Sequence, residues 1–140
     1  MKQIFESDNI RYAEVSEDFL RDYLIMVNDA EHVAGFIGMT EPVSEEKERD
    51  FIRKKLEENA PIFSMIDKKS GGFIGNIELM DVEDDAGELG IAITAGMQDM
   101  GYGTEAIRAI IEYGFEQMGL KRIFLKVYPN NFRAIHVYRK

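Results

Sequence analysis

The stretch Gln98-Asp99-Met100-Gly101-Tyr102-Gly103-Thr104 stands between a short apolar strand and a long amphipathic helix that the sequence predicts over 104–118. A glycine-bearing loop that opens a helix presents unpaired backbone N–H groups at the positive end of the helix dipole, where a phosphate binds well. The glycines also let a ligand approach the main chain closely. This stretch therefore predicts a nucleotide-like ligand held by main-chain amides.

Hydrophobic periodicity on both sides of this loop predicts an α+β fold. Ser16 and Ser44 precede two helical patterns as N-caps, and Gly119 ends a third. We expect the order β-α-α-β-β-β-α-β-α and a mixed, mostly antiparallel sheet flanked by helices. The predicted strands cover residues 10–15, 62–67, 73–80, 88–93 and 122–127, and the predicted helices cover 17–27, 45–59, 104–118 and about 130–138.

The composition is typical of one globular domain over residues 1–140. The chain has no cysteine, which excludes disulfides, thiolate nucleophiles and cysteine-based zinc sites. His32 and His136 are the two histidines, and they lie far apart in the sequence. We therefore expect no metal site.

The net charge of −9 argues against nucleic acid as a partner. Basic residues outnumber acidic ones after residue 100, which suits an anionic cofactor, while the acidic remainder suits a cationic substrate. Both surfaces could equally be solvated faces that keep the protein soluble. No stretch has the apolar length of a membrane span or a signal peptide, so we expect a cytoplasmic protein that does not bind membranes.

Gly101-x-Gly103-x-x-Ala106 formally matches the dinucleotide-binding fingerprint. In dinucleotide-binding proteins this motif follows its strand directly, and an acidic residue that belongs to the same binding site stands at the end of the next strand. Here residues 94–97 intervene, and the strand predicted over 122–127 is followed by Tyr128-Pro129-Asn130 with no acid. A dinucleotide-binding protein is therefore the weaker interpretation.

Three segments together resemble the GNAT superfamily of N-acetyltransferases, and within it the RimJ/RimL and spermidine acetyltransferase branch. The first is Glu88-Leu-Gly-Ile-Ala-Ile93, the second is Gln98-x-x-Gly101-x-Gly103-Thr104, and the third is Asn131-Phe-Arg-Ala134-Ile-His-Val-Tyr138. The resemblance covers about residues 88–140. It implies acetyl-CoA as the cofactor and acetyl transfer to a primary amine.

The resemblance also implies a role for each matching position. The strand Ile91-Ala92-Ile93 would pair with the pantetheine arm, and the amides from Met100 to Thr104 would hold the pyrophosphate. Asn131 would contact the pantetheine arm or fix the loop, and Ala134 would leave room beside the cofactor. The implied cofactor-binding residues are Ile91, Ala92, Ile93, Gln98, Met100, Gly101, Tyr102, Gly103, Thr104, Asn131 and Ala134.

Tyr138 matches the tyrosine that protonates the departing thiolate in this family, a plausible acid because a phenol is close to a thiol in proton affinity. Glu88 stands where the family often has a glutamate that deprotonates the amine, directly or through water. A core aromatic is the alternative role for Tyr138, and the polar edge of an acidic turn is the alternative for Glu88. Direct transfer in a ternary complex is expected, since no cysteine is available for an acetyl-enzyme.

Two departures from the family pattern qualify these expectations. Asp99-Met100 stands where relatives often carry Gly-Lys, so the phosphate loop lacks a cation there. Relatives also continue past the tyrosine into one or two further strands, so the sequence suggests a fragment, an omitted tail or an edge covered by a second subunit in a homodimer.

The acceptor would be a polyamine, a small cationic amine or a basic protein N-terminus. The alternative is a non-catalytic acyl-CoA-binding or interaction module.

Overall fold

The computed structural model describes residues 1–29, 31, 41–127 and 133–138, with 126, 127 and 133–138 as backbone. Seven strands form one sheet in which each strand lies beside the strand before it in the sequence. All neighbouring pairs are antiparallel except β5 and β6, which are parallel and joined by α3. The elements are β1 (Gln3–Glu6), β2 (Ile10–Glu14), α1 (Leu20–Val27), α2 (Glu45–Glu57), β3 (Ile62–Asp67), β4 (Phe73–Glu83), β5 (Ala86–Ile93), α3 (Tyr102–Glu116), β6 (Arg122–Val127) and β7 (Arg133–Tyr138).

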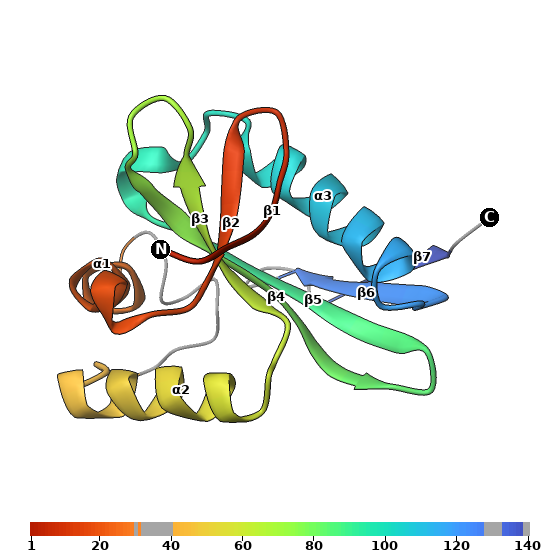
Figure 1. Cartoon of the computed structure of the whole chain (residues 1–140), viewed down its shortest axis with the longest axis horizontal. Helices are drawn as coiled ribbons and strands as arrows, with labels where there is room; N and C mark the ends of the chain where they lie inside the picture. The colour runs from red at the N-terminus through yellow and green to blue at the C-terminus, as the bar shows by residue number, and fades with distance from the viewer. Residues whose placement is uncertain (30, 32–40, 128–132, 139–140) are drawn as a thin grey trace.

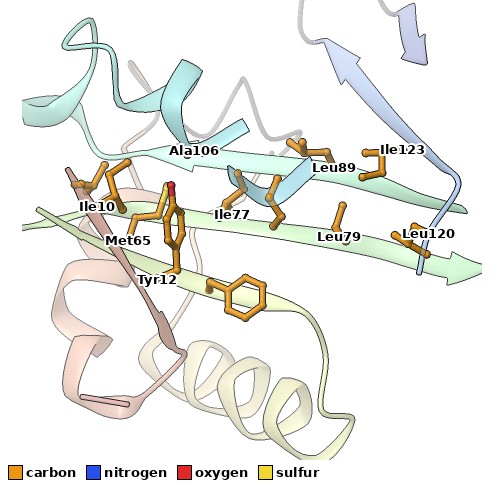
Figure 2. Close-up of a cluster of buried hydrophobic side chains, with 12 residues drawn as sticks. Ile10, Tyr12, Met65, Ile77, Leu79, Leu89, Ala106, Leu120 and Ile123 are labelled. Carbon is orange, nitrogen blue, oxygen red and sulfur yellow. The ribbon is translucent and has the colours of Figure 1, made fainter. Parts of the chain in front are cut away.

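The helices divide between the two faces of the sheet (Figure 1). On one face, α3 covers a cluster of buried side chains that includes Met65, Ile77 and Ile110 (Figure 2). On the other face, α1 and α2 cover a smaller cluster that includes Tyr23 and Ile52. The α+β class with a mixed, mostly antiparallel sheet is therefore confirmed.

Alternation along β4 sorts its side chains between these faces, as a strand requires. Ile77 and Leu79 are buried in the cluster under α3. Asn76, Glu78 and Met80 lie on the opposite face and line a cavity beneath α1 and α2. The sheet thus has one closed, apolar face and one face with polar groups at a cavity.

Two helix boundaries follow the capping residues that the sequence predicts. Ser44 Oγ accepts a hydrogen bond of 3.1 Å from the backbone N–H of Lys47 at the start of α2. Gly119 adopts a left-handed φ of 70° after α3, and the N–H of Leu120 bonds to the carbonyl of Gly114 at 3.0 Å. Both caps are confirmed.

The element order differs from the prediction in two places. Strand β1, which the sequence analysis did not predict, pairs with β2. The helix predicted over 130–138 is wrong, because Arg133–Tyr138 forms β7 and pairs antiparallel with β6. Ile135 and Val137 are β-branched residues at alternate positions, and the free edge of β6 offers a full ladder of hydrogen bonds that outweighs the weaker helical pattern.

Strands β4 and β5 approach closely at Gly75. A Cβ at this position would lie 1.9 Å from the carbonyl oxygen of Ala92, so only glycine fits there. Asn76 follows directly and is paired in register with Ala92.

Candidate functional site: an opening beside strand β5

Strand β5 is paired along its whole length on one side and along only half of it on the other. Its ladder with β4 extends to the pair Gly75–Ile93. Its ladder with β6 runs from Ala86–Arg122 to Leu89–Leu125 and ends there. The stretch from Gly90 to Ile93 therefore has an edge that no described strand covers.

Backbone groups of Ile91 and Ile93 point toward this open edge. The N–H of Thr94 donates to the carbonyl of Ile74 on β4 at 2.9 Å, and alternate residues of a strand direct their polar groups to opposite sides. The side-chain amide of Gln98 donates to the carbonyl of Ile93 at 2.8 Å on the side away from β4. The open edge thus offers the N–H and carbonyl of Ile91 and the N–H of Ile93 to an extended ligand, while the carbonyl of Ile93 is already bonded to Gln98.

The N-terminus of α3 follows a few residues later. Gly101 is the N-cap with a left-handed φ of 86°, and this glycine supplies no side-chain cap; among the described residues no side-chain hydrogen bond caps the helix. The N–H of Glu105 makes the first bond to the helix-capping carbonyl of Gly101, at 3.3 Å. The amides of Tyr102, Gly103 and Thr104 precede that bond and lie at the positive end of the dipole, an arrangement that suits an anion.

Two tethers hold this helix terminus against distant loops. The hydroxyl of Tyr102 donates to Asp67 at 2.9 Å, at the end of β3. Glu105 accepts hydrogen bonds from the Ser7 hydroxyl at 2.5 Å and from both the backbone and the side chain of Asn9 at 2.8 and 2.7 Å. Partial burial alone would raise the pKa of Glu105, but these hydrogen bonds together lower it. The first turn of α3 is therefore fixed before any ligand binds.

A cavity of about 470 Å³ lies between the sheet and the helices α1 and α2. It reaches the open edge, because the residues of β5 from Glu88 to Ala92 line part of its wall. Helix α2 contributes Lys47, Glu48 and Phe51 to the opposite wall. A ligand in this cavity would therefore meet a second ligand that lies along β5.

Carboxylates dominate the charged groups of the cavity. Glu48 is only 5% exposed, and burial raises the pKa of its carboxyl. No hydrogen bond or ion pair reaches this carboxyl from the residues that the structure describes. Burial also raises the pKa of Glu78, against the opposing effect of Lys55, whose ammonium lies 3.4 Å from the carboxylate. The cavity suits a cation, which would offset the cost of these buried charges.

The structure brings together most of the residues that the sequence singled out. Ile91, Ala92 and Ile93 form the open edge, and Gln98 binds to it. The residues from Met100 to Thr104 lie at the start of α3, with Met100 exposed. Glu88 lines the cavity and is half-buried.

The segment after β6 does not join this group. Asn131 lies outside the described residues. The backbone of Ala134 pairs with Lys126, and the backbone of Tyr138 pairs with Arg122, which in turn pairs with Ala86. Tyr138 therefore lies level with the start of β5, at the end of that strand opposite to Ile91–Ile93.

Sequence reasoning missed three residues of the cavity: Glu48, Glu78 and Asn76. Glu48 belongs to a strongly charged stretch, so nothing local marks it as less exposed than its neighbours. Glu78 stands between two apolar residues of β4. Asn76 follows the glycine of the β4–β5 close approach. Asn76 and Glu78 are two residues apart in a strand, and this spacing is the one signal that could have placed their side chains on the same face of the sheet.

Within the described ranges, no group of three or more His, Cys, Asp or Glu side chains is arranged to hold a metal ion. A search of the same residues for a helix with the length and apolar character needed to cross a membrane finds none.

Residues 10–140 match the family model described as the acetyltransferase (GNAT) domain. Among curated proteins, the chain is 33% identical over 98 residues to an uncharacterized N-acetyltransferase, YnaD, of Bacillus subtilis. That match covers 69% of this chain and 58% of the relative, so the chain spans less than two thirds of the curated relative's length.

Solved structures share the fold. A GNAT-family acetyltransferase from Bacillus anthracis superposes with a TM-score of 0.78 at 23% identity, covering 90% of this chain and 74% of that protein. A spermidine N-acetyltransferase from Vibrio cholerae, solved in complex with CoA and spermine, superposes with a TM-score of 0.77 at 22% identity, covering 86% and 72%. At these identities the likeness concerns the fold.

Proposed function

Because the chain belongs to the GNAT acetyltransferase family, we propose that it transfers an acetyl group from acetyl-CoA to a primary amine by direct attack in a ternary complex. One observation carries this proposal. The ladder between β5 and β6 ends at Leu89–Leu125, and the edge that it leaves open runs from the uncapped terminus of α3 to a cavity with carboxylates. An anionic ligand and a cationic one would therefore meet at one strand.

The residues present fit acetyl-CoA, which supplies a thioester when bound. Backbone groups of Ile91 and Ile93 would pair with its pantetheine arm, as an added strand pairs with a sheet edge. The amides of Tyr102, Gly103 and Thr104 would bind the pyrophosphate. We also propose that Asn131 and Ala134 make the cofactor contacts that the family resemblance implies.

Two carboxylates in the cavity are candidates to take a proton from the amine. Glu88 is the residue that the sequence predicts. Glu78 is paired in register with Gly90, at the start of the open edge. Glu88 is paired with Met80 and lies two residues before that edge along β5. Burial raises the pKa of Glu78, which brings it closer to the value that a base needs at neutral pH. We propose Glu78 as the principal base and Glu88 as its neighbour.

Tyr138 keeps its proposed role as the acid that protonates the thiolate. The register of β7 separates its backbone from Ile91–Ile93, so this role requires the segment after β6 to rearrange. Tyr138→Phe tests it: the role predicts a lower turnover with unchanged coenzyme A binding. Equal turnover of variant and parent protein would remove Tyr138 from the reaction.

The acceptor class follows from the charge of the cavity. Among the described residues, the walls of the cavity carry three carboxylates and one ammonium group: Glu48, Glu78, Glu88 and Lys47. The ammonium of Lys55 is already paired with Glu78. An ammonium group is the complementary ligand. The proposed acceptors are a polyamine, another small cationic amine or the N-terminus of a basic peptide, and the spermidine N-acetyltransferase from Vibrio cholerae was solved with spermine bound.

A thiol-release assay with acetyl-CoA and a broad panel of amines tests the activity. Release of coenzyme A that depends on the amine, together with acetylated product by mass spectrometry, would support the enzyme. Coenzyme A binding without transfer to any amine would favour a non-catalytic acyl-CoA-binding module. A larger melting-temperature shift with NAD than with coenzyme A would contradict the proposed cofactor.

A further inference from the structure

A chain of hydrogen bonds crosses from α1 to the cavity through the interior of the sheet. The backbone N–H of Ser16 donates to the hydroxyl oxygen of Tyr23 at 3.3 Å. That hydroxyl lies 2.5 Å from Ser64 Oγ on β3, and Ser64 Oγ donates to Asn76 Oδ1 on β4 at 2.8 Å. Tyr23 and Ser64 are 1% and 0% exposed, so water does not compete for these bonds.

The direction of the chain is set at its beginning. A backbone N–H can only donate, so the Tyr23 oxygen accepts from Ser16. The Tyr23 proton is buried and needs an acceptor of its own, and among the described residues Ser64 Oγ is the partner within hydrogen-bond distance. Ser64 then accepts from Tyr23 and donates its proton onward to Asn76 Oδ1. Asn76 consequently holds its carbonyl toward Ser64 and its NH₂ group away from it.

Tyr23 stays neutral throughout the working pH range, since burial raises its pKa to about 12. The proton that it donates is therefore always present. Ser64 has no titratable group. The orientation of the Asn76 amide is thus independent of pH in this range.

The NH₂ group of Asn76 faces the cavity. Asn76 is half-buried and lines it together with Glu78, its neighbour on the same face of β4. In the described part of the chain, every fully buried side-chain nitrogen or oxygen has a hydrogen-bond partner. Nδ2 of Asn76 donates no hydrogen bond to those residues, so it is accessible from the cavity.

We propose that Asn76 is a specificity-determining residue, which selects amines that carry a carbonyl or hydroxyl oxygen next to the reacting nitrogen. This inference rests on the proposed acetyl transfer. The carboxylate of Glu78 would hold the ammonium, and Asn76 Nδ2 would donate to the neighbouring oxygen of the same molecule. An amino acid amide at a peptide N-terminus and an amino sugar both have this chemistry.

A plain polyamine lacks such an oxygen. With a polyamine in the cavity, the Asn76 amide would lose water and gain no acceptor, which is costly for a polar group. Sites built around a hydrogen bond discriminate strongly against ligands that cannot form it. The orienting chain therefore favours oxygen-bearing amines over hydrocarbon amines of the same shape.

Matched amine pairs test the inference with the full chain. We would measure binding by calorimetry in the presence of coenzyme A, below the pKa of all amines used. L-alaninamide is compared with 3-methylbutan-2-amine, its hydrocarbon isostere, and D-glucosamine with cyclohexylamine; 1,4-diaminobutane represents the polyamines. We expect the oxygen-bearing member of at least one pair to bind about tenfold tighter or more, and the pair that shows it identifies a peptide-like or a sugar-like acceptor.

Variants separate recognition from structure. Asn76→Asp keeps the acceptor for Ser64 but replaces the donor with a carboxylate, which can itself accept from the hydroxyl or NH₂ groups of the ligands, so it serves as the control for charge and should tighten the binding of every amine, with or without an oxygen. Asn76→Leu should abolish the preference while it weakens the hydrocarbon amines little. Ser64→Ala frees the Asn76 amide to rotate and should give an intermediate preference. The melting temperature and the affinity for coenzyme A of each variant serve as the controls for folding.

The inference would be overturned by equal binding within both pairs, by tightest binding of 1,4-diaminobutane, or by a preference that survives Asn76→Leu. Failure to bind any amine would also count against it. Failure of the proposed function is a different result, namely no acetyl transfer from acetyl-CoA to any amine in the panel. Binding and transfer are measured separately, so each failure can be recognised on its own.

Discussion

The two faces of the sheet are built from alternate residues of the same strands, yet they differ in almost every physical property. On the α3 face, Ile77 and Leu79 are at most 3% exposed, and a Cβ added to Gly114 would lie 3.0 Å from Ile123. On the other face, Asn76 and Glu78 border a cavity of about 470 Å³. One face is packed to the density of a protein interior, and the other keeps room and polar groups for a ligand.

This difference shows where stability and function are separated in the molecule. Contacts on the α3 face fix the sheet and the helix whose first turn presents the amides. Polar groups on the other face add cost to folding, because buried carboxylates such as Glu48 lose hydration. Substitutions on the two faces should therefore change different measured quantities.

The largest expected effect comes from the cavity face. Glu78→Gln should lower kcat/KM for the amine about 10²- to 10³-fold, because the glutamine cannot accept a proton, while coenzyme A binding stays unchanged. Burial raises the pKa of Glu78, and Lys55 opposes this shift. The acid limb of the pH profile should therefore lie above the ordinary carboxyl range, and Lys55→Met should move it to still higher pH.

Glu88→Gln is the matched control for this experiment, since Glu88 lines the same cavity. A greater loss of kcat/KM in Glu88→Gln than in Glu78→Gln would transfer the role of base to Glu88. Unchanged kcat/KM in both variants would contradict the assignment of catalysis to the cavity face, because neither β4 nor β5 would then supply the proton acceptor.

The neighbouring pair Leu79 and Met80 tests the closed face against the open one. Leu79→Ala should lower the free energy of unfolding by about 3 kcal/mol, since it leaves a void under α3. Met80→Ala should cost about 1 kcal/mol or less, because Met80 already borders open space. Urea titrations monitored by circular dichroism measure both. Equal costs would mean that the cavity face is as tightly packed as the other.

The sequence predicts the closed face better than the open one, for a physical reason. Regular spacing of apolar residues in α3 and alternation in β4 determine which side chains are buried, and both patterns are local. The chain Tyr23–Ser64–Asn76 joins residues 41 and 12 positions apart, so no local pattern reveals it. The loop Gln98–Thr104 was predictable because its glycines and its helix are adjacent.

Errors in the predicted fold arise at the sheet edges. Strand β1 is too short, at four residues, for alternation to be recognised. In the sequence before β7, Asn131 is equally typical of a helix N-cap and of a turn, and the neighbouring edge of β6 decides between helix and strand for Arg133–Tyr138. Edge pairing is a tertiary effect that local propensity does not contain.

A smaller effect is expected at Glu48. Its carboxyl has a raised pKa in the folded chain, so the folded state binds the proton more tightly, and the stability falls as the pH rises through that pKa. Glu48→Gln removes this cost and should raise the melting temperature by about 3 °C at pH 7.5. The gain should vanish near pH 4, where the unfolded carboxyl is protonated too. Glu46→Gln, on the exposed side of the same first turn, controls for the loss of a favourable charge near the helix N-terminus and should not raise the melting temperature.

The smallest effect is expected at Asp99, just before the helix terminus. Asp99 is exposed and adopts a left-handed φ of 60°. Asp99→Lys replaces a repulsive charge with an attractive one and should tighten coenzyme A binding about threefold at low salt, with a loss of the gain at high salt. Asp99→Asn should give about half of this change in free energy. An unchanged or weaker affinity in Asp99→Lys would contradict a phosphate at this terminus.

The tethers of α3 carry a consequence for the order of events during synthesis. Glu105 is bound by Ser7 and Asn9, which lie 98 and 96 residues earlier in the chain. The first turn of α3 therefore cannot take its final position until its own residues have left the ribosome and found a hairpin made long before. This first turn should be one of the last parts of the protein to mature, and hydrogen exchange on nascent chains would detect this delay.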